Sequence, residues 1–279
     1  MRRLARLLAL AALLGSSAAL AQSYAQVKGM EERFRIDLGG FLQDFDTTVR
    51  YDPAGGGSGT EISLEDDLGY STSKTSFKLD GYWRFGPRGR LDFAYQTFRR
   101  GSSHTLEKEI VFGDEVYAVG ATVSSDSSVD VGELYYSYSM LNTGEAEVGL
   151  MLGVSTFFNK WEFEAAGAVS GGGGSQAGSM QREATELIAP IPAIGAFARY
   201  TLLPRFFAHG RVKWMKATIS DYTGSMLHWR AGLDYYFTPN VGIGAAWDST
   251  ELDIEKQQDA TVALDYSYSG PVGYLSITF

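Results

Sequence analysis

The chain contains three histidines, His104, His209 and His228, which are the side chains best suited to acid-base chemistry near neutral pH. A hydrolytic site would need one of them beside a carboxylate or a serine within hydrogen-bonding reach. The elements that carry the histidines decide whether such a site can form. His104 begins a polar connection, so only the other two lie on regular segments.

The segments around the last two histidines alternate apolar and polar residues, as β-strands do. If a turn centred near residue 222 joins the two strands, the first histidine lies beside Tyr235 or Tyr236 and the second near Lys216. At about 3.4 Å per residue, the two histidines are then separated by roughly 20 Å or more along the strands. This spacing predicts that they do not share one site.

His209 is instead expected to make a structural contact with Asp234 on the neighbouring strand. Because no serine falls near a histidine and an acid, we predict no catalytic residue. We also predict no metal site and no cofactor. The glycines at 171–174 predict a flexible external connection, since a phosphate-binding loop needs a strand before it and a helix after it. The acidic stretch from Glu61 to Asp67 is expected to be solvated, with divalent-cation binding as the alternative.

The first 21 residues differ in composition from the rest of the chain. Arg2, Arg3 and Arg6 precede the apolar run from Leu7 to Leu14, which is the plan of a secretory signal peptide. Ala19 and Ala21 supply small residues for cleavage after Ala21, which leaves one mature domain over residues 22–279. Removal of three arginines changes the net charge from −9 to −12, which argues against nucleic acid as a partner.

Ten segments of the mature chain alternate apolar and polar residues without a break in phase. None of their apolar faces carries a charge, and a Lys or Arg on a lipid face would cost about 2 to 4 kcal/mol. The segments cover residues 34–43, 77–85, 90–96, 133–140, 147–155, 194–202, 208–214, 227–237, 241–248 and 274–279.

The connections between these segments are alternately short and long, which favours a transmembrane barrel over a soluble β-sandwich. The short ones are 86–89, 141–146, 203–205 and 238–240, and the long ones are 52–70, 102–127, 164–186 and 255–262, with 220–225 compact. We predict an all-β, antiparallel up-and-down transmembrane β-barrel of about ten strands, with eight or twelve as alternatives. Residues 105–123 also alternate, so they could extend the third and fourth strands into a hairpin above the membrane.

Aromatic residues fall near both ends of the predicted strands, as the two interfacial girdles of a membrane barrel require. The predicted interface residues are Trp83, Phe85, Tyr200, Tyr235, Phe237 and Phe279 at the periplasmic ends and Trp214, Trp229 and Trp247 toward the external ends.

The C-terminal alternation Leu275, Ile277, Phe279 ends on phenylalanine and resembles the signature of outer-membrane barrels that the barrel-assembly machinery recognises. Pro271 and Gly273 depart from the usual apolar choice. Three further motifs are Glu65-Asp66-Asp67-Leu68-Gly69, Phe112-Gly113-Asp114 and the run from Tyr135 to Tyr138. Through these motifs the chain resembles a group of proteobacterial outer-membrane barrels to which no reaction is assigned.

Charges of both signs face the predicted barrel interior in nearly equal numbers. Because a barrel of about ten strands has little free interior, these charges are expected to pair and to fill it. The cationic members are Arg35, Lys78, Arg84, Arg90, Arg199, Arg211, Lys213 and Arg230, with His209, and the acidic members are Asp37, Asp80, Asp92, Glu133, Glu147, Asp234 and Asp248.

The functional expectation is therefore a non-enzymatic barrel of the bacterial outer membrane with a mostly occluded interior. Its external loops would contact the envelope or an extracellular protein partner, and its other partners would be outer-membrane lipid, lipopolysaccharide and the assembly machinery. A small porin-like channel is the first alternative, since strand number and tilt decide the pore width. A barrel hydrolase, either a protease or a lipid A-modifying enzyme, is the second, although no omptin or deacylase motif is matched.

Overall fold

A computed structural model describes residues 32–52, 61–112, 115–166, 168–171, 174–177, 181–219, 222–257 and 261–279. The proposed signal peptide and its cleavage site after Ala21 lie outside these residues. Within the described part of the chain, no helix is long and apolar enough to cross a membrane.

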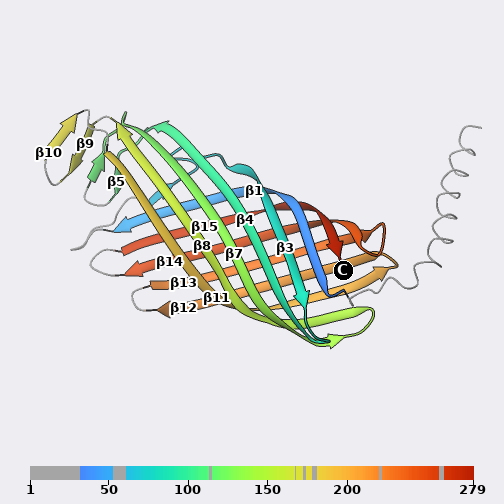
Figure 1. The fold of residues 1–279 in the computed structure, drawn as a ribbon. Helices are drawn as coiled ribbons and strands as arrows, with labels where there is room; N and C mark the ends of the chain where they lie inside the picture. Colours follow the sequence, from blue (N-terminus) through green and yellow to red (C-terminus); the bar gives the residue numbers. More distant parts are fainter. Residues whose placement is uncertain are drawn as a thin grey trace, which may run out of the picture.

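Ten long antiparallel strands form a closed barrel, as the alternation predicted (Figure 1). Each strand pairs with the next along the chain, and the last pairs with the first from Arg35 opposite Thr278 to Asp52 opposite Thr261, which closes the sheet. The barrel strands are β1 (Phe34–Asp52), β3 (Ser73–Arg84), β4 (Gly89–Thr105), β7 (Thr122–Asn142), β8 (Ala146–Ala166), β11 (Gln181–Leu203), β12 (Phe206–Ile219), β13 (Tyr222–Tyr236), β14 (Val241–Gln257) and β15 (Thr261–Thr278).

The four predicted short turns all lie at one end of the barrel, together with the C-terminus (Figure 1). We call this the turn end and the opposite one the loop end. Short turns are periplasmic in outer-membrane barrels, so the prediction of such a barrel implies that the loop end is external. Outward-facing apolar side chains near the turn end form an apolar belt, which includes Trp83, Leu150 and Trp214.

The strands are much longer than the sequence pattern indicated, so the predicted long connections were wrong in extent. β4 continues to Thr105 and β7 starts at Thr122, while β8 continues to Ala166 and β11 starts at Gln181. Beyond the belt, β7 and β14 carry polar residues on the outward face, and apolar residues appear on the inward face, as with Asp130 outside and Val131 inside. The apolar face therefore changes sides within one strand. A prediction that requires apolar residues to stay on one face ends each strand at that change, which is too early.

A small second sheet lies at the loop end, with strand order β10, β9, β6, β5. It confirms that the 105–123 region extends into a hairpin. Of the glycines predicted to form a flexible connection, Gly171 and Gly174 pair with each other, and residues 172–173 lie outside the described part of the chain. The strands are β5 (Ile110–Phe112), β6 (Glu115–Tyr117), β9 (Ala168–Gly171) and β10 (Gly174–Ala177), and a further short strand, β2 (Glu61–Ser63), pairs with β1.

Candidate functional site

The inward-facing charges meet in the half of the barrel nearest the turn end. Apart from Glu32, which precedes β1, each comes from a position in the polar phase of its strand, because the belt residues on either side point outward. Ion pairs within 4.0 Å join Arg35 to Asp37 and Asp234, Lys78 to Asp248, Arg84 and Arg90 to Glu147, Arg90 to Asp92, Arg211 and Arg230 to Asp80, Lys213 to Glu133, and Arg199 to Glu32.

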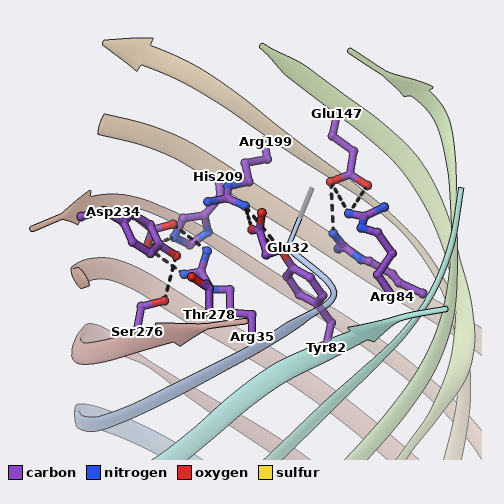
Figure 2. Close-up of polar contacts among 12 residues, drawn as sticks. Glu32, Arg35, Tyr82, Arg84, Glu147, Arg199, His209, Asp234, Ser276 and Thr278 are labelled. Atoms are coloured by element: carbon purple, nitrogen blue, oxygen red, sulfur yellow. Dashed lines mark hydrogen bonds and ion pairs between the residues drawn. The ribbon is translucent and has the colours of Figure 1, made fainter. Parts of the chain in front are cut away.

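Asp234 on β13 accepts hydrogen bonds from three groups in a fully buried position. Arg35 Nη1 and Nη2 each lie 2.9 Å from its carboxylate oxygens, and the Tyr274 hydroxyl donates to Oδ1 at 2.6 Å. His209 Nε2 is 2.7 Å from the same hydroxyl and 3.7 Å from Asp234 Oδ1 (Figure 2). The expected partnership of His209 with Asp234 is thus made partly through a tyrosine.

The predicted register of the β12–β13 hairpin was wrong. His209 lies opposite Gly232, and His228 lies opposite Lys213, because the turn is tighter than assumed and shifts the pairing by three residues or more. The two histidines are therefore offset by four residues, or about 13 Å, instead of 20 Å or more. They still belong to different networks, since His228 Nδ1 contacts Thr250 Oγ1 at 3.0 Å.

Glu32 is a buried interior residue that the sequence pattern did not reveal. It precedes β1, and its carboxylate accepts hydrogen bonds from the Tyr82 hydroxyl at 2.5 Å and from Arg199 Nη1 (Figure 2). Glu32 thereby supplies the carboxylate that forms an ion pair with Arg199 at the turn end. The alternation could not have found Glu32, because the residue lies before the first strand.

Glu147 shows how the interior acids are shared between strands. Its carboxylate accepts hydrogen bonds from Arg84 Nη2 at 2.8 Å and from Ser139 Oγ at 2.5 Å, while Arg90 Nη1 is 3.5 Å away. The side chain of Glu147 is completely buried. Such a group is stable in a low-dielectric interior only when its partners are in place.

Above the charged layer, aromatic rings fill the barrel. Phe45 packs against Phe98 and Tyr266 with centroid distances of 5.4 and 6.2 Å, and Tyr268 lies 5.7 Å from Tyr266. These rings point inward from β1, β4 and β15 and are all buried. Sequence reasoning missed this layer because it searched the inward face for charges only.

The segment between β2 and β3 folds into the barrel at the loop end. Glu65 enters the barrel, where its carboxylate lies 2.5 Å from Arg100 Nη1 and accepts a hydrogen bond from the Thr47 backbone N–H at 2.9 Å. Leu64 and Tyr70 of the same segment are buried. The expectation that this acidic stretch is solvated was therefore wrong for Glu65, whose side chain is only 6% exposed.

The predicted interface aromatics lie on the outer face, where their strands cross from the belt to polar surface. The external tryptophans mark this change clearly: on β14 the next exposed residue after Trp247 is Glu251, and on β12 the next exposed residue after Trp214 is Lys216. At the turn end, the outward-facing set comprises Trp83, Phe85, Tyr200, Tyr235, Phe237 and Phe279. Trp229 is outward-facing between its neighbours on β12 and β14.

Among the described residues, no group of three or more histidine and acidic side chains is arranged to hold a metal ion. The two buried histidines both lie within structural hydrogen-bond networks, and their side chains are 18% and 5% exposed. The arrangement as a whole ties strands that are distant in sequence across the interior. Its evident physical effect is to hold the barrel closed.

No family model matches this chain, and no curated protein matches it. Among solved structures, the outer membrane protease OmpT from Escherichia coli covers 88% of this chain and 97% of its own length, with a TM-score of 0.51 and 14% identity. The translocator domain of the autotransporter NalP from Neisseria meningitidis covers 97% and 98%, with a TM-score of 0.46 and 12% identity. At such identities the likeness concerns architecture alone. The likeness to OmpT, together with the apolar belt and the closed sheet, shows that this chain has the fold of the outer-membrane β-barrel proteins.

Proposed function

We propose that this protein is a non-enzymatic, closed barrel of the outer membrane whose external end contacts the envelope or a partner protein. The observation that carries the proposal is a set of buried contacts at three successive levels of the interior, from the turn end to the loop end. Ion pairs occupy the part near the turn end, aromatic rings occupy the middle, and the Glu65–Arg100 pair fixes a loop over the far end. A path for ions would have to break these contacts.

The external end supports the second half of the proposal. β4, β7, β8 and β11 continue past the belt and lead to the four-stranded sheet, which gives a structured surface far from the turn end (Figure 1). An ordered extension of this kind holds a recognition surface at a fixed height above the membrane. An extracellular or envelope protein, or lipopolysaccharide, is the partner class that such a surface can reach.

Single-channel recording in planar bilayers tests the closed interior. We expect the purified wild-type protein to show no stable openings at neutral pH, while its folded state is verified by its resistance to unfolding in cold SDS. Stable, reproducible openings would overturn the proposal and support the small-channel alternative. The matched variant is Glu65→Gln, which removes the loop's buried ion pair and leaves the ionic layer near the turn end unchanged.

Peptidase and lipid A modification assays test the non-enzymatic part. We expect no activity that depends on His209 or His228, because both side chains are buried in structural networks. A robust activity lost in His209→Ala or His228→Ala, with the barrel still folded, would instead establish a hydrolase.

A further inference from the structure

The apolar belt is taller on β8 and β11 than on the strands beside them. On β12 its last member is Trp214, eight residues from the start of the strand. On β8 the outward apolar face continues to Phe158, 12 residues from Ala146, and on β11 it continues to Ile188, 15 residues from Leu203.

These additional residues form a continuous exposed surface, which we call the apolar stripe: Phe158, Ile188, Pro190 and Pro192. Ile188 and Phe158 lie directly opposite each other on neighbouring strands, and they are 65% and 45% exposed. Ile194 and Leu152 continue the surface downward into the belt. The stripe therefore joins the lipid-facing surface without a polar break on β11.

The height of the stripe follows from strand geometry. The Phe158–Ile188 pair lies 12 residues along the strands from the Ala146–Tyr200 pair at the turn end. With a rise of about 3.3 Å per residue and a tilt of about 35 to 45°, both residues therefore lie roughly 28 to 32 Å above the level of that pair. The apolar band of outer-membrane barrels is about 25 Å tall. Both residues thus lie above the level where the belt should end.

Other strands are polar at the height of Phe158. The outward residues 12 positions from the turn end are Asp46 on β1, Asp130 on β7, Thr218 on β12 and Asp253 on β14. Asp130 borders the stripe directly, since it pairs with Phe158, and it accepts a hydrogen bond from the Tyr95 hydroxyl at 2.9 Å. The stripe is therefore a local feature about two strands wide.

The backbone of β11 argues against a protein strand as the occupant. Its ladder with β8 runs unbroken through Pro190 and Pro192, whereas its ladder with β12 starts only at Ile194. The proline nitrogens must therefore face the unpaired side, where they offer no N–H donors. A peptide added along this edge would lack the ladder hydrogen bonds that give such complexes their affinity.

We propose that the apolar stripe binds an acyl chain of an outer-leaflet lipid and holds it above the level of the surrounding belt. The surface is apolar, continuous with the lipid-contacting belt and bounded by polar residues. An acyl chain needs no hydrogen-bond partner, and exposed apolar surface of this kind gains free energy by leaving water. The proposal rests on the membrane placement of the barrel given above.

Site-directed spin labelling tests the proposal on the full chain in lipid vesicles that contain lipopolysaccharide. The chain has no cysteine, so a single introduced cysteine carries the only label. The test positions are Phe158→Cys and Ile188→Cys. The lipid control is Leu150→Cys within the belt, and the water control is Thr218→Cys, at the height of Phe158 on β12. Collisions with oxygen report lipid, and collisions with a water-soluble nickel chelate report water.

We expect the labels at the two stripe positions to match the Leu150 label, with most nickel collisions lost, while the Thr218 label collides freely with nickel. Stripe labels that match the Thr218 label would overturn the proposal. Stripe labels shielded from both reagents would also overturn it, since they would show contact with a second protein copy. A further label, Leu202→Cys, lies near the turn end of the same strand as Ile188. If this label collides freely with nickel, the whole barrel tilts so that this side sits higher on the loop-end side, and the stripe lies within the ordinary bilayer; this result would also overturn the proposal. Failure of the Leu150 control would instead refute the membrane placement itself.

Discussion

Asp80 offers the most direct measure of how dry the barrel interior is. Its carboxylate lies 2.5 Å from Arg211 Nη2 and 2.6 Å from Arg230 Nη1, and its side chain is 6% exposed. The variant Asp80→Asn keeps the shape of the side chain but removes the charge that the guanidinium groups of Arg211 and Arg230 share. Breaking a buried ion pair from one side typically costs about 3 to 5 kcal/mol.

We expect Asp80→Asn to lower the free energy of unfolding by about 3 kcal/mol, the lower end of that range. The reason is that Arg230 keeps a second carboxylate, Asp248, at 3.8 Å. The assay is urea unfolding from lipid vesicles, followed by tryptophan fluorescence. The matched control is Arg50→Gln, which breaks a surface pair with Asp52 at 3.3 Å and should cost less than about 1 kcal/mol.

A loss as small as that of the control would refute the reasoning, because it would mean that water already solvates the interior charges. That result would also favour the channel alternative. The double variant Asp80→Asn with Arg230→Met gives a further check, since it removes one of the stranded cations. We expect it to be more stable than the sum of the two single effects predicts.

Three further predictions concern other parts of the barrel. Glu65→Gln should speed backbone hydrogen exchange in residues 63–72 without changing exchange in the belt, since it removes the ion pair that fixes this segment; unchanged exchange would contradict its role. Gly244→Ala should cost about 1 to 3 kcal/mol of unfolding free energy, because a Cβ there would lie 2.2 Å from Tyr274 Cζ; a cost near zero would contradict the close packing. Burial and the facing Asp253 carboxylate raise the pKa of Asp265, outside the belt, so Asp265→Asn should stabilise the protein at neutral pH and lose this effect below the ordinary pKa of aspartate.

The sign of the Asp265 effect follows from proton linkage. A carboxyl whose pKa is raised on folding binds its proton more tightly in the folded state, so its contribution to stability is present at low pH. That contribution is lost as the pH rises through the raised pKa. Unfolding midpoints of wild type and variant across this range provide the measurement, and parallel curves at every pH would contradict the prediction.

The sequence alone determined the class of fold, the number of strands and the face of each strand that meets lipid. The reason is that side chains alternate strictly along a strand, so a lipid-facing surface appears as a local pattern that needs no knowledge of neighbours. Leu38, Leu150 and Trp247 were assigned outward by this rule, and all three are exposed in the structure. The turns could also be placed, because short turns interrupt the pattern at the same end.

Tertiary structure decided where strands end and which charges meet. Beyond the belt, the outward residues face water and the interior stays packed, so apolar residues move from the outward to the inward face. A pattern that assumes one apolar face along the whole strand therefore places the strand ends wrongly. Arg35 meets Asp234 although 199 residues separate them, and this choice depends on how the closed sheet staggers its strands. Glu65 likewise became a buried partner only because its segment folds over the barrel, since burial of a charge depends on a cation from another strand.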